Sequence, residues 1–157
     1  MDRSPLQQFI SQRLGDVTLT PPAVVAPSTS VRDAVTTMQR DGHSCVLAME
    51  GDRLAGIFTE RDVLTKCMAT GFDWDQPLTA AALTRNPRTI PFTSSVAEAI
   101  ATMQQHRYRS LPVVRDGRVA GLVRLGDLLK QFAETYPDEV LNLPPRPHQI
   151  MEKPEGG

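Results

Sequence analysis

An internal duplication constrains the fold more than any other feature of this sequence. When the chain is shifted against itself by ~65 positions, about a dozen of roughly 46 aligned pairs are identical without a gap. The identities include glycine, proline and aspartate, which a shared hydrophobic period alone would not bring into line. Among the identical pairs are Pro22 with Pro87, Gly56 with Gly121, and Asp62 with Asp127. We therefore expect two copies of one structural unit that bury a common core.

Each copy shows the same order of predicted elements. A Ser/Thr-rich helix start is followed by apolar residues at i, i+3, i+4 and i+7, which predicts an amphipathic helix, and two apolar runs joined by a polar turn with glycine predict a β-hairpin. In the first copy, the segments are an extended piece at Val24–Ala26, a strand at Cys45–Met49, a return strand at Leu54–Phe58 and a closing helix from near Thr59. In the second copy, they are an extended piece at Thr89–Pro91, a strand at Ser110–Val114, a return strand at Val119–Val123 and a closing helix from near Arg124.

The unit thus reads β-α-β-β-α, which places the chain in the α/β (α+β) class. Because one unit alone would expose an apolar sheet face, we expect two pseudo-symmetric repeats packed sheet to sheet. The predicted division is an N-terminal helix in 1–16 (at Pro5–Leu14), a first repeat in 17–70, a linker in 71–83, a second repeat in 84–136, and a proline-rich tail without regular structure in 137–157, where 141–145 is a candidate docking strip.

Composition and charge argue against several classes of protein. The formal net charge is −1, so no overall field would attract nucleic acid or an anionic membrane. Residues 1–14 lack the apolar core of a signal peptide, and no apolar run approaches the ~18 residues that cross a bilayer, so we expect a cytoplasmic protein without a membrane partner. The two cysteines form no CxxC pair and the three histidines are scattered, so no disulfide framework and no metal site are expected.

The turn Gly56–Asp62 lies where a strand passes into a helix, and it allows two interpretations. A helix N-terminus offers free N–H groups to an anion, and a carboxylate can accept two hydrogen bonds from a vicinal diol such as a ribose. Thr59 and Asp62 also have the spacing of a capping box, in which each side chain accepts the backbone N–H of the other residue. The second copy keeps Asp127 but has Arg124 in place of the threonine, so its carboxylate lacks that capping partner.

The Gly-h-h-Thr-x-x-Asp turn at 56–62, the β-α-β-β-α order and the strand Leu111–Val114 resemble a tandem pair of CBS (cystathionine-β-synthase-type) domains, a Bateman module, in stand-alone form. The resemblance covers about residues 17–134. It implies a regulatory module that is not an enzyme, requires no cofactor and binds AMP, ADP or ATP between the repeats, with S-adenosylmethionine as a further candidate ligand. It also implies a disc-like homodimer and regulation of an unknown target protein.

The resemblance also implies which residues line the two clefts between the repeats. Residues carried over to the main cleft are Thr59, Arg61, Asp62, Thr89, Ile90, Tyr108, Arg109, Ser110 and Pro112. Residues carried over to the second cleft are Val24, Val25, Thr29, Ala34, His43, Ser44, Cys45, Arg124 and Asp127. In the main cleft Thr59 and Asp62 would hold a ribose, and Arg61, in the first turn of the helix, is a candidate partner for phosphate.

Two departures from the family pattern both affect the second cleft. Arg124 stands where the family prefers serine or threonine, and Leu47 stands at the position of Pro112 in the other copy. Arg124 would either block that cleft, turn toward a phosphate or remain a solvated or ion-paired arginine. We therefore expect unequal sites, with the nucleotide in the Asp62 cleft.

Other interpretations stay open at this point. The same fold would also serve as a ligand-free scaffold for dimerisation or protein interaction. The apolar residues expected on the contact helices are Leu64, Met68 and Ala69 on one and Leu128, Leu129 and Phe132 on the other. The run His106–Arg109 is typical of a solvated helix end, a phosphate-facing segment or a short nucleic-acid patch, of which the last fits a net acidic chain least well.

Overall fold

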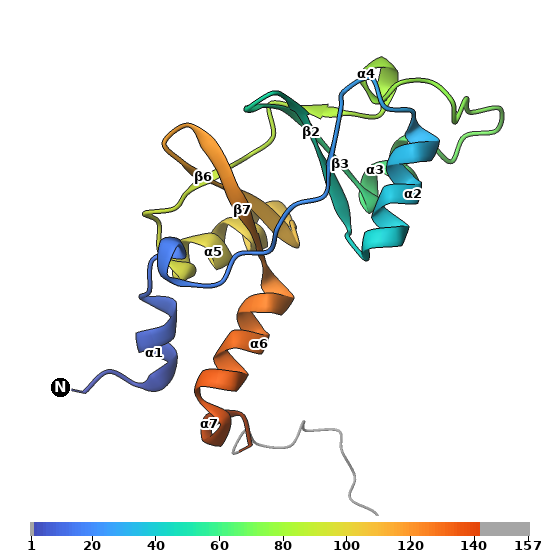
Figure 1. Cartoon of the computed structure of the whole chain (residues 1–157). Coiled ribbons are helices and arrows are strands. Elements are labelled where there is room, and N and C mark those ends of the chain that lie inside the picture. Colours follow the sequence, from blue (N-terminus) through green and yellow to red (C-terminus); the bar gives the residue numbers. More distant parts are fainter. Residues whose placement is uncertain (1, 142–157) are drawn as a thin grey trace, which may run out of the picture.

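The structure, a computed structural model, describes residues 2–141, and these form two small sheets flanked by helices (Figure 1). The first sheet has the order β1-β2-β3-β4 and the second has the order β5-β6-β7. The strands are β1 (Val24–Val25), β2 (Cys45–Glu50), β3 (Arg53–Thr59), β4 (Thr84–Arg85), β5 (Ile90–Pro91), β6 (Ser110–Arg115) and β7 (Arg118–Arg124). The helices are α1 (Pro5–Ile10), α2 (Val31–Asp41), α3 (Glu60–Lys66), α4 (Leu78–Ala81), α5 (Val96–His106), α6 (Leu125–Thr135) and α7 (Pro137–Leu141), with a 3-10 turn η1 at Leu14–Asp16.

The two sheets repeat the same pairing in detail, which confirms the duplication and the α/β class. In both repeats the first strand pairs parallel with the second, and the second pairs antiparallel with the third. A β-bulge follows Ala48 in the first hairpin and Val113 in the second, at equivalent positions. Both β-hairpins lie where the sequence predicts them, and each strand begins and ends within one residue of its predicted bounds.

The sheets face each other across an apolar layer. Cys45, Leu47 and Leu122 are buried there, so strands of both repeats contribute to one core cluster. The Cys45 Sγ and Ser110 Oγ atoms lie 3.8 Å apart, although these residues hold equivalent positions in the two repeats. Equivalent residues can contact each other only at the symmetry axis, so the pseudo-two-fold axis passes between them. This arrangement confirms the expected sheet-to-sheet packing.

Helices α2 and α5 begin with side-chain caps and bury one stripe against their own sheet. The Ser30 hydroxyl accepts the backbone N–H of Asp33, and Ser95 and Glu98 form a full capping box. Both helices end in the left-handed region, α2 at Gly42 with φ +66° and α5 at Arg107 with φ +56°. Glycine adopts that conformation without a Cβ penalty, whereas arginine does not, so the two repeats end this helix at different cost.

Each sheet is completed by a segment from outside its own unit. Strand β4, placed in the second repeat by the predicted boundary at residue 84, pairs with β3 of the first sheet. In the same way Thr20, which precedes the first repeat's sheet, exchanges two backbone hydrogen bonds of 2.8 Å with Leu122 in the second sheet. A Cβ added to Gly56 would lie 2.7 Å from the Thr84 carbonyl oxygen, and one on Gly121 would lie 2.9 Å from the Cβ of Leu19. The glycines therefore permit close crossing of these segments.

The N-terminal helix is shorter than predicted and covers part of the second repeat. It ends at Ile10 rather than Leu14, and the chain then crosses the second sheet to reach the first repeat (Figure 1). The rings of Phe9 and Phe132 meet edge to face, 5.5 Å between centroids, and Leu128 is 2% exposed. Leu128 and Phe132 therefore belong to the core and not to the exposed helical surface expected from the sequence, whereas Leu129 is exposed.

The predicted linker 71–83 contains helix α4, whose Leu78 is fully buried in the first core. The prediction of a tail without regular structure from residue 137 needs correction. The tail from Pro137 begins with helix α7. Proline is tolerated at the first helical position, because the N–H that it lacks would have no partner within the helix. The candidate docking strip at 141–145 lies outside the described residues from position 142 onward.

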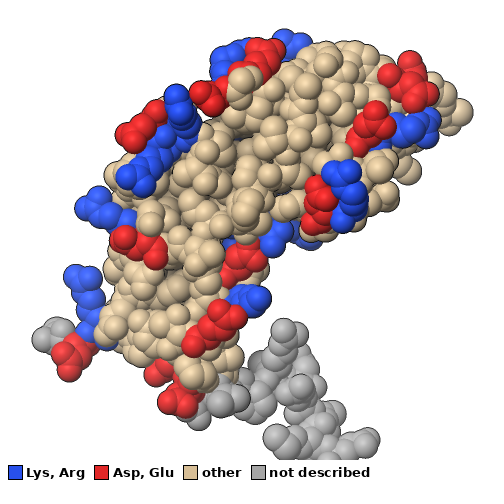
Figure 2. All heavy atoms as spheres, in the orientation of Figure 1, with Lys and Arg blue, Asp and Glu red and all other residues tan. Residues whose placement is uncertain are grey.

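Charged side chains of both signs are interspersed, mostly along the edges of the face shown in Figure 2, with uncharged residues between them. This distribution agrees with a formal net charge of −1. Within residues 2–141, no helix combines the length and apolar character that crossing a membrane requires.

The crossing at Gly56 generates a testable prediction. Gly56→Ala is expected to destabilise the fold by about 1–3 kcal/mol, because the added methyl would press on the backbone of β4. Gly126→Ala is the matched control: Gly126 is helical and has open space around its Cβ position, so alanine is expected to be neutral or to stabilise by up to about 1 kcal/mol. Urea unfolding measures both; equal effects would contradict close crossing as the reason for Gly56.

Candidate functional site

Asp62 lies at the N-terminus of α3 and is 7% exposed. It forms the predicted capping box: its Oδ2 accepts the Thr59 backbone N–H at 2.9 Å, and the Thr59 hydroxyl accepts the Asp62 N–H at 3.2 Å. The Thr59 hydroxyl also donates to Oδ2 at 3.1 Å. The structural interpretation of the motif is therefore correct, and a ligand would use a carboxylate that already caps a helix.

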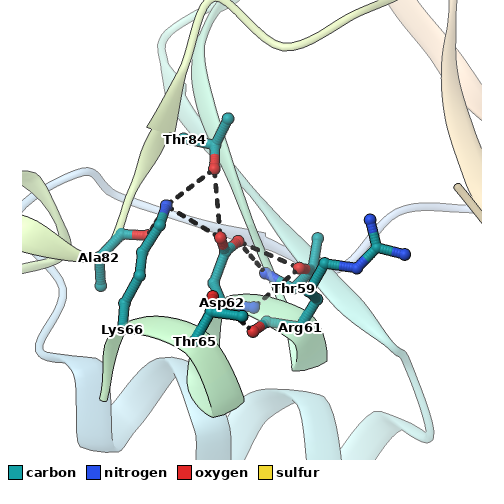
Figure 3. A network of polar contacts seen from close by, with 7 residues as sticks. All are labelled: Thr59, Arg61, Asp62, Thr65, Lys66, Ala82 and Thr84. Carbon is teal, nitrogen blue, oxygen red and sulfur yellow. Dashed lines mark hydrogen bonds and ion pairs between the residues drawn. The ribbon is translucent and has the colours of Figure 1, made fainter. Parts of the chain in front are cut away.

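The other carboxylate oxygen of Asp62 is held from outside α3's first turn (Figure 3). Its Oδ1 lies 2.9 Å from the Lys66 ammonium and accepts the Thr84 hydroxyl at 3.3 Å. Lys66 also donates to the Ala82 carbonyl at 3.2 Å, whereas the guanidinium of Arg61 points away from Asp62. A carboxylate has about four lone-pair positions, and protein donors occupy this number at Asp62. A diol that binds here must replace at least one of them.

A cleft of about 420 Å³ opens beside this network, between the two repeats. Seven of the nine residues predicted for the main cleft line it: Thr59, Arg61, Asp62, Tyr108, Arg109, Ser110 and Pro112. They come from the β3–α3 turn of one repeat and from the start of β6 in the other, because the sheet-to-sheet packing brings these two strand ends together. The fold thus assembles one cleft from segments that are about 50 residues apart in sequence.

Two predicted residues of the main cleft are not among those that line it. Ile90 is 6% exposed and packs in the core of the second repeat, because β5 lies parallel to β6 and turns this side chain inward. Thr89 is exposed but lies outside the lining set. The placement of these two side chains therefore differs from the sequence prediction.

Several lining residues were missed by sequence reasoning. They include Ile57, Leu111 and Leu64 on the apolar side and Thr84 and Arg88 on the polar side, whereas Arg107 belongs to the run His106–Arg109 for which a phosphate-facing role was one of the interpretations. Thr84 had a signal: Leu19-Thr20 and Leu83-Thr84 repeat at a shift one position shorter than the rest of the duplication. An alignment with a gap would have paired the two threonines, each of which donates its hydroxyl to the aspartate of the sheet it crosses.

Asp127 is closed off differently from Asp62. The Arg124 guanidinium makes two hydrogen bonds to its carboxylate, at 2.7 and 3.1 Å, and the Thr20 hydroxyl donates to it as well. The hydrogen bonds from Arg124 hold the pKa of the Asp127 carboxyl below its usual range, the Thr20 hydroxyl acts in the same direction, and Asp127 in turn raises the pKa of Arg124. Arg124 thus supplies in cis the two hydrogen-bond donors that a diol would otherwise offer to this carboxylate.

The remaining residues predicted for the second cleft do not gather into one lining. Ala34 is fully buried in the core of the first repeat, because α2 directs it at its own sheet, and Val25 packs against the same core. Val24 is exposed and Thr29 is half-buried. Val24, Thr29 and Asp127 line neither the main cleft nor the second groove that is described next. Cys45 reaches the main cleft instead.

A second groove, of about 690 Å³, lies on the helical side of the first repeat. His43, Ser44 and Arg124 line it together with apolar residues of α2 and α3. The Nδ1 atom of His43 is buried and makes no hydrogen bond within residues 2–141. The three second-cleft residues that the structure brings together therefore face this groove, on the α2–α3 side, and not a mirror image of the Asp62 cleft.

The Arg124 contact can be tested through the ionisation of Asp127. Because the folded-state pKa of Asp127 is depressed, its charged form stabilises the fold at neutral pH, and this contribution is lost as the pH falls through that pKa. Arg124→Thr is expected to raise the pKa of Asp127, measured by carboxyl NMR titration, and to reduce the stability lost between about pH 5 and 2. An unchanged Asp127 titration would contradict the ion pair.

Comparison with known proteins gives consistent results across sequence relatives. The sequence model of the CBS domain matches residues 14–69 and 80–134. The CBS domain-containing protein YhcV of Bacillus subtilis is 30% identical over 113 residues, which are 72% of this chain and 80% of YhcV. A CBS domain-containing protein of Arabidopsis thaliana is 37% identical over 100 residues, 63% of this chain, and the chain spans only 18% of that longer protein.

Solved structures agree with this assignment. A protein with CBS domains from Burkholderia ambifaria is 31% identical, with a TM-score of 0.66 over 78% of this chain and 91% of that one. A CBS domain protein from Pyrobaculum aerophilum, solved in complex with AMP, shares the fold at 22% identity, with a TM-score of 0.67 over 78% of this chain and 99% of that one. Because the family match covers both repeats, the chain belongs to the CBS-domain family.

Proposed function

We propose that this protein is a regulatory module that binds an adenine nucleotide in the Asp62 cleft. The observation that carries the proposal is the convergence of Thr59 and Asp62 from the first repeat with the segment Tyr108–Pro112 from the second in one cleft. The complex of the Pyrobaculum aerophilum protein with AMP supports this ligand class, as does a CBS domain pair of the same fold in complex with 5′-methylthioadenosine and S-adenosyl-L-methionine.

The lining of the cleft suits the parts of a nucleotide. The carboxylate of Asp62 and the hydroxyl of Thr59 would hold the ribose diol, since both are already oriented by the capping box. Ile57, which is half-buried, and Tyr108, which is exposed, supply apolar surface for a base. No covalent step is needed for this role, and the chain acts by binding rather than by catalysis.

The contacts of Asp62 suggest how occupancy would be transmitted. Thr84 and Lys66 connect its Oδ1 to β4 and to the end of α4 at Ala82. A diol that takes the place of Thr84 at this oxygen would loosen the crossing segment that leads into the second repeat. Binding at Asp62 would thereby change the relation of the two repeats, and a target protein of unknown identity would respond to that change.

We further propose that two copies pair through the helical face of the first repeat. Leu64 on α3 and Met68, which follows the end of α3 at Lys66, are 69% and 64% exposed. They adjoin the groove lined by Val35, Met38 and Val63, whereas α1 covers part of the corresponding side of the second repeat. A second copy of this chain would bury these side chains in a two-fold interface.

A ligand-free scaffold is the second candidate function, and one observation favours it. Protein donors already satisfy the carboxylates of Asp62 and Asp127, so neither carboxylate requires a ligand. The free thiols of Cys45 and Cys67 suit either role in the reducing interior of a cell, where we propose that the protein works.

Calorimetric titration with AMP and ATP separates these candidates. We expect one nucleotide per chain, because Arg124 occupies the carboxylate of the second site. Asp62→Asn is expected to weaken binding at least about tenfold through loss of an ionised acceptor, whereas Asp127→Asn, the matched control, changes it little. Circular dichroism must show that both variants are folded, since Asp62 also caps α3. Equal affinity of wild type and folded Asp62→Asn would refute the site, and no binding at all would favour the scaffold.

The oligomeric state tests the proposed interface. Leu64→Glu is expected to yield a monomer of 17.3 kDa by light scattering, whereas the wild type has twice that mass, because a carboxylate cannot be buried unpaired in an apolar contact. Leu6→Glu serves as a control, since Leu6 is 54% exposed on α1, away from this face. A monomeric wild type, or a Leu64→Glu dimer, would overturn the proposal.

A further inference from the structure

Four arginines line the Asp62 cleft. Arg61 lies in the first turn of α3, Arg88 precedes β5, and Arg107 and Arg109 lie between α5 and β6. All four are exposed, and among the described residues only Arg61 makes a side-chain hydrogen bond, to the backbone carbonyl of Arg107 at 2.5 Å. A carbonyl is neutral, so it orients a guanidinium without cancelling its charge. The segments from both repeats thus direct unpaired positive charge to one cleft.

The acidic residues of the cleft do not balance these arginines. Glu60 and Asp62 are the carboxylates in the lining, against four guanidiniums. The Asp62 carboxylate lies 2.9 Å from Lys66, which contributes a further positive charge behind the cleft. The chain as a whole has a formal charge of −1, so the positive charge here is a local feature and not a reflection of composition.

The duplication supplies an internal comparison for these four positions. The equivalents of Arg61, Arg88, Arg107 and Arg109 in the other repeat are Gly126, Ala23, Gly42 and Ser44. The same fold is therefore built at these positions without a basic residue.

Arg107 adds a conformational argument. It ends α5 with φ +56°, in the left-handed region where the other repeat has Gly42 at φ +66°. An L side chain is disfavoured there, so the arginine is placed at this turn against local backbone preference. Backbone strain of this kind occurs at sites where a side chain serves a function other than folding.

We propose that the Asp62 cleft selects adenine nucleotides with two or more phosphates, ADP and ATP, over AMP, adenosine and S-adenosylmethionine. This inference rests on the proposed function, that the cleft binds an adenosine-containing ligand. Guanidinium groups form paired, charge-assisted hydrogen bonds with phosphate oxygens. A chain of two or three phosphates carries enough oxygens to bind several guanidinium groups at once. The sulfonium of S-adenosylmethionine is positively charged, so the same arginines repel it.

Calorimetric titration of the full chain with adenosine, AMP, ADP, ATP, S-adenosylmethionine and inorganic tripolyphosphate tests the selection. We expect ATP to bind at least about tenfold more tightly than AMP, S-adenosylmethionine to bind more weakly than AMP, and the difference between ATP and AMP to shrink as salt is raised.

Two variants that install the residue of the other repeat sharpen the test. Arg107→Gly and Arg88→Ala are each expected to weaken ATP about five- to tenfold while adenosine is unchanged. Arg107→Gly also relieves the left-handed turn, so its melting temperature should not fall and unfolding cannot explain the loss. Arg118→Gln is the control: Arg118 pairs with Asp52 and lines neither cleft.

The outcomes separate this inference from the function on which it rests. Equal affinities for adenosine, AMP and ATP, or no effect of the two arginine variants, would overturn phosphate selection and leave the nucleotide site in place. Binding of tripolyphosphate without binding of any adenosine compound would overturn the nucleotide site and support the anion preference. No binding of any of these compounds would overturn both.

Discussion

Asp62 and Asp127, the equivalent aspartates of the two repeats, each depend on a close backbone crossing at a glycine. Segment 83–85 crosses the first sheet at Gly56, and segment 19–20 crosses the second at Gly121, where added methyl groups would collide with the passing chain. Each crossing brings a threonine hydroxyl to the carboxylate at the start of the next helix. Because each crossing segment comes from outside the β-α-β-β-α unit that it completes, neither unit is finished by its own residues. The geometry around both carboxylates is therefore a property of the pair of repeats.

The two repeats share one fold but surround their equivalent aspartates with different side chains. At Asp62 a threonine caps the helix and the carboxylate faces a cleft, whereas at Asp127 an arginine in the threonine's place binds the carboxylate from the same turn. The loss of the hydroxyl removes a cap, and the gain of the guanidinium satisfies the acceptor that would otherwise be free. The arginine in place of threonine thus gives one of two equivalent carboxylates a bidentate guanidinium partner in its own turn, whereas the other carboxylate shares a capping box.

Asp62 combines stability with recognition, and the two roles compete. Its oxygens accept the Thr59 N–H and hydroxyl and the Thr84 hydroxyl, and the Lys66 ammonium lies within 2.9 Å. Hydrogen bonds to a carboxylate contribute about 1.5–3 kcal/mol each, so a ligand gains at this position only the difference between its own contacts and those it replaces. The rest of its affinity must come from the apolar wall and from the arginines. This makes the charge of the cleft, more than the aspartate, the feature that distinguishes one adenosine compound from another.

The sequence by itself determined the duplication and the order and approximate bounds of the strands and main helices, because caps, turns and hydrophobic periods are local and each copy can be compared with the other. The two segments that meet at Asp62 were implied by the resemblance to CBS domains and not by these local patterns. The sequence did not determine the surroundings of every side chain: Ile90 joins a core, and Leu128 and Phe132 are covered near α1. Nor did it reveal Thr84 and Arg88 as cleft residues. These depend on which distant segment crosses or covers which sheet, and such contacts leave no periodic trace along the chain, so only the tertiary structure decided them.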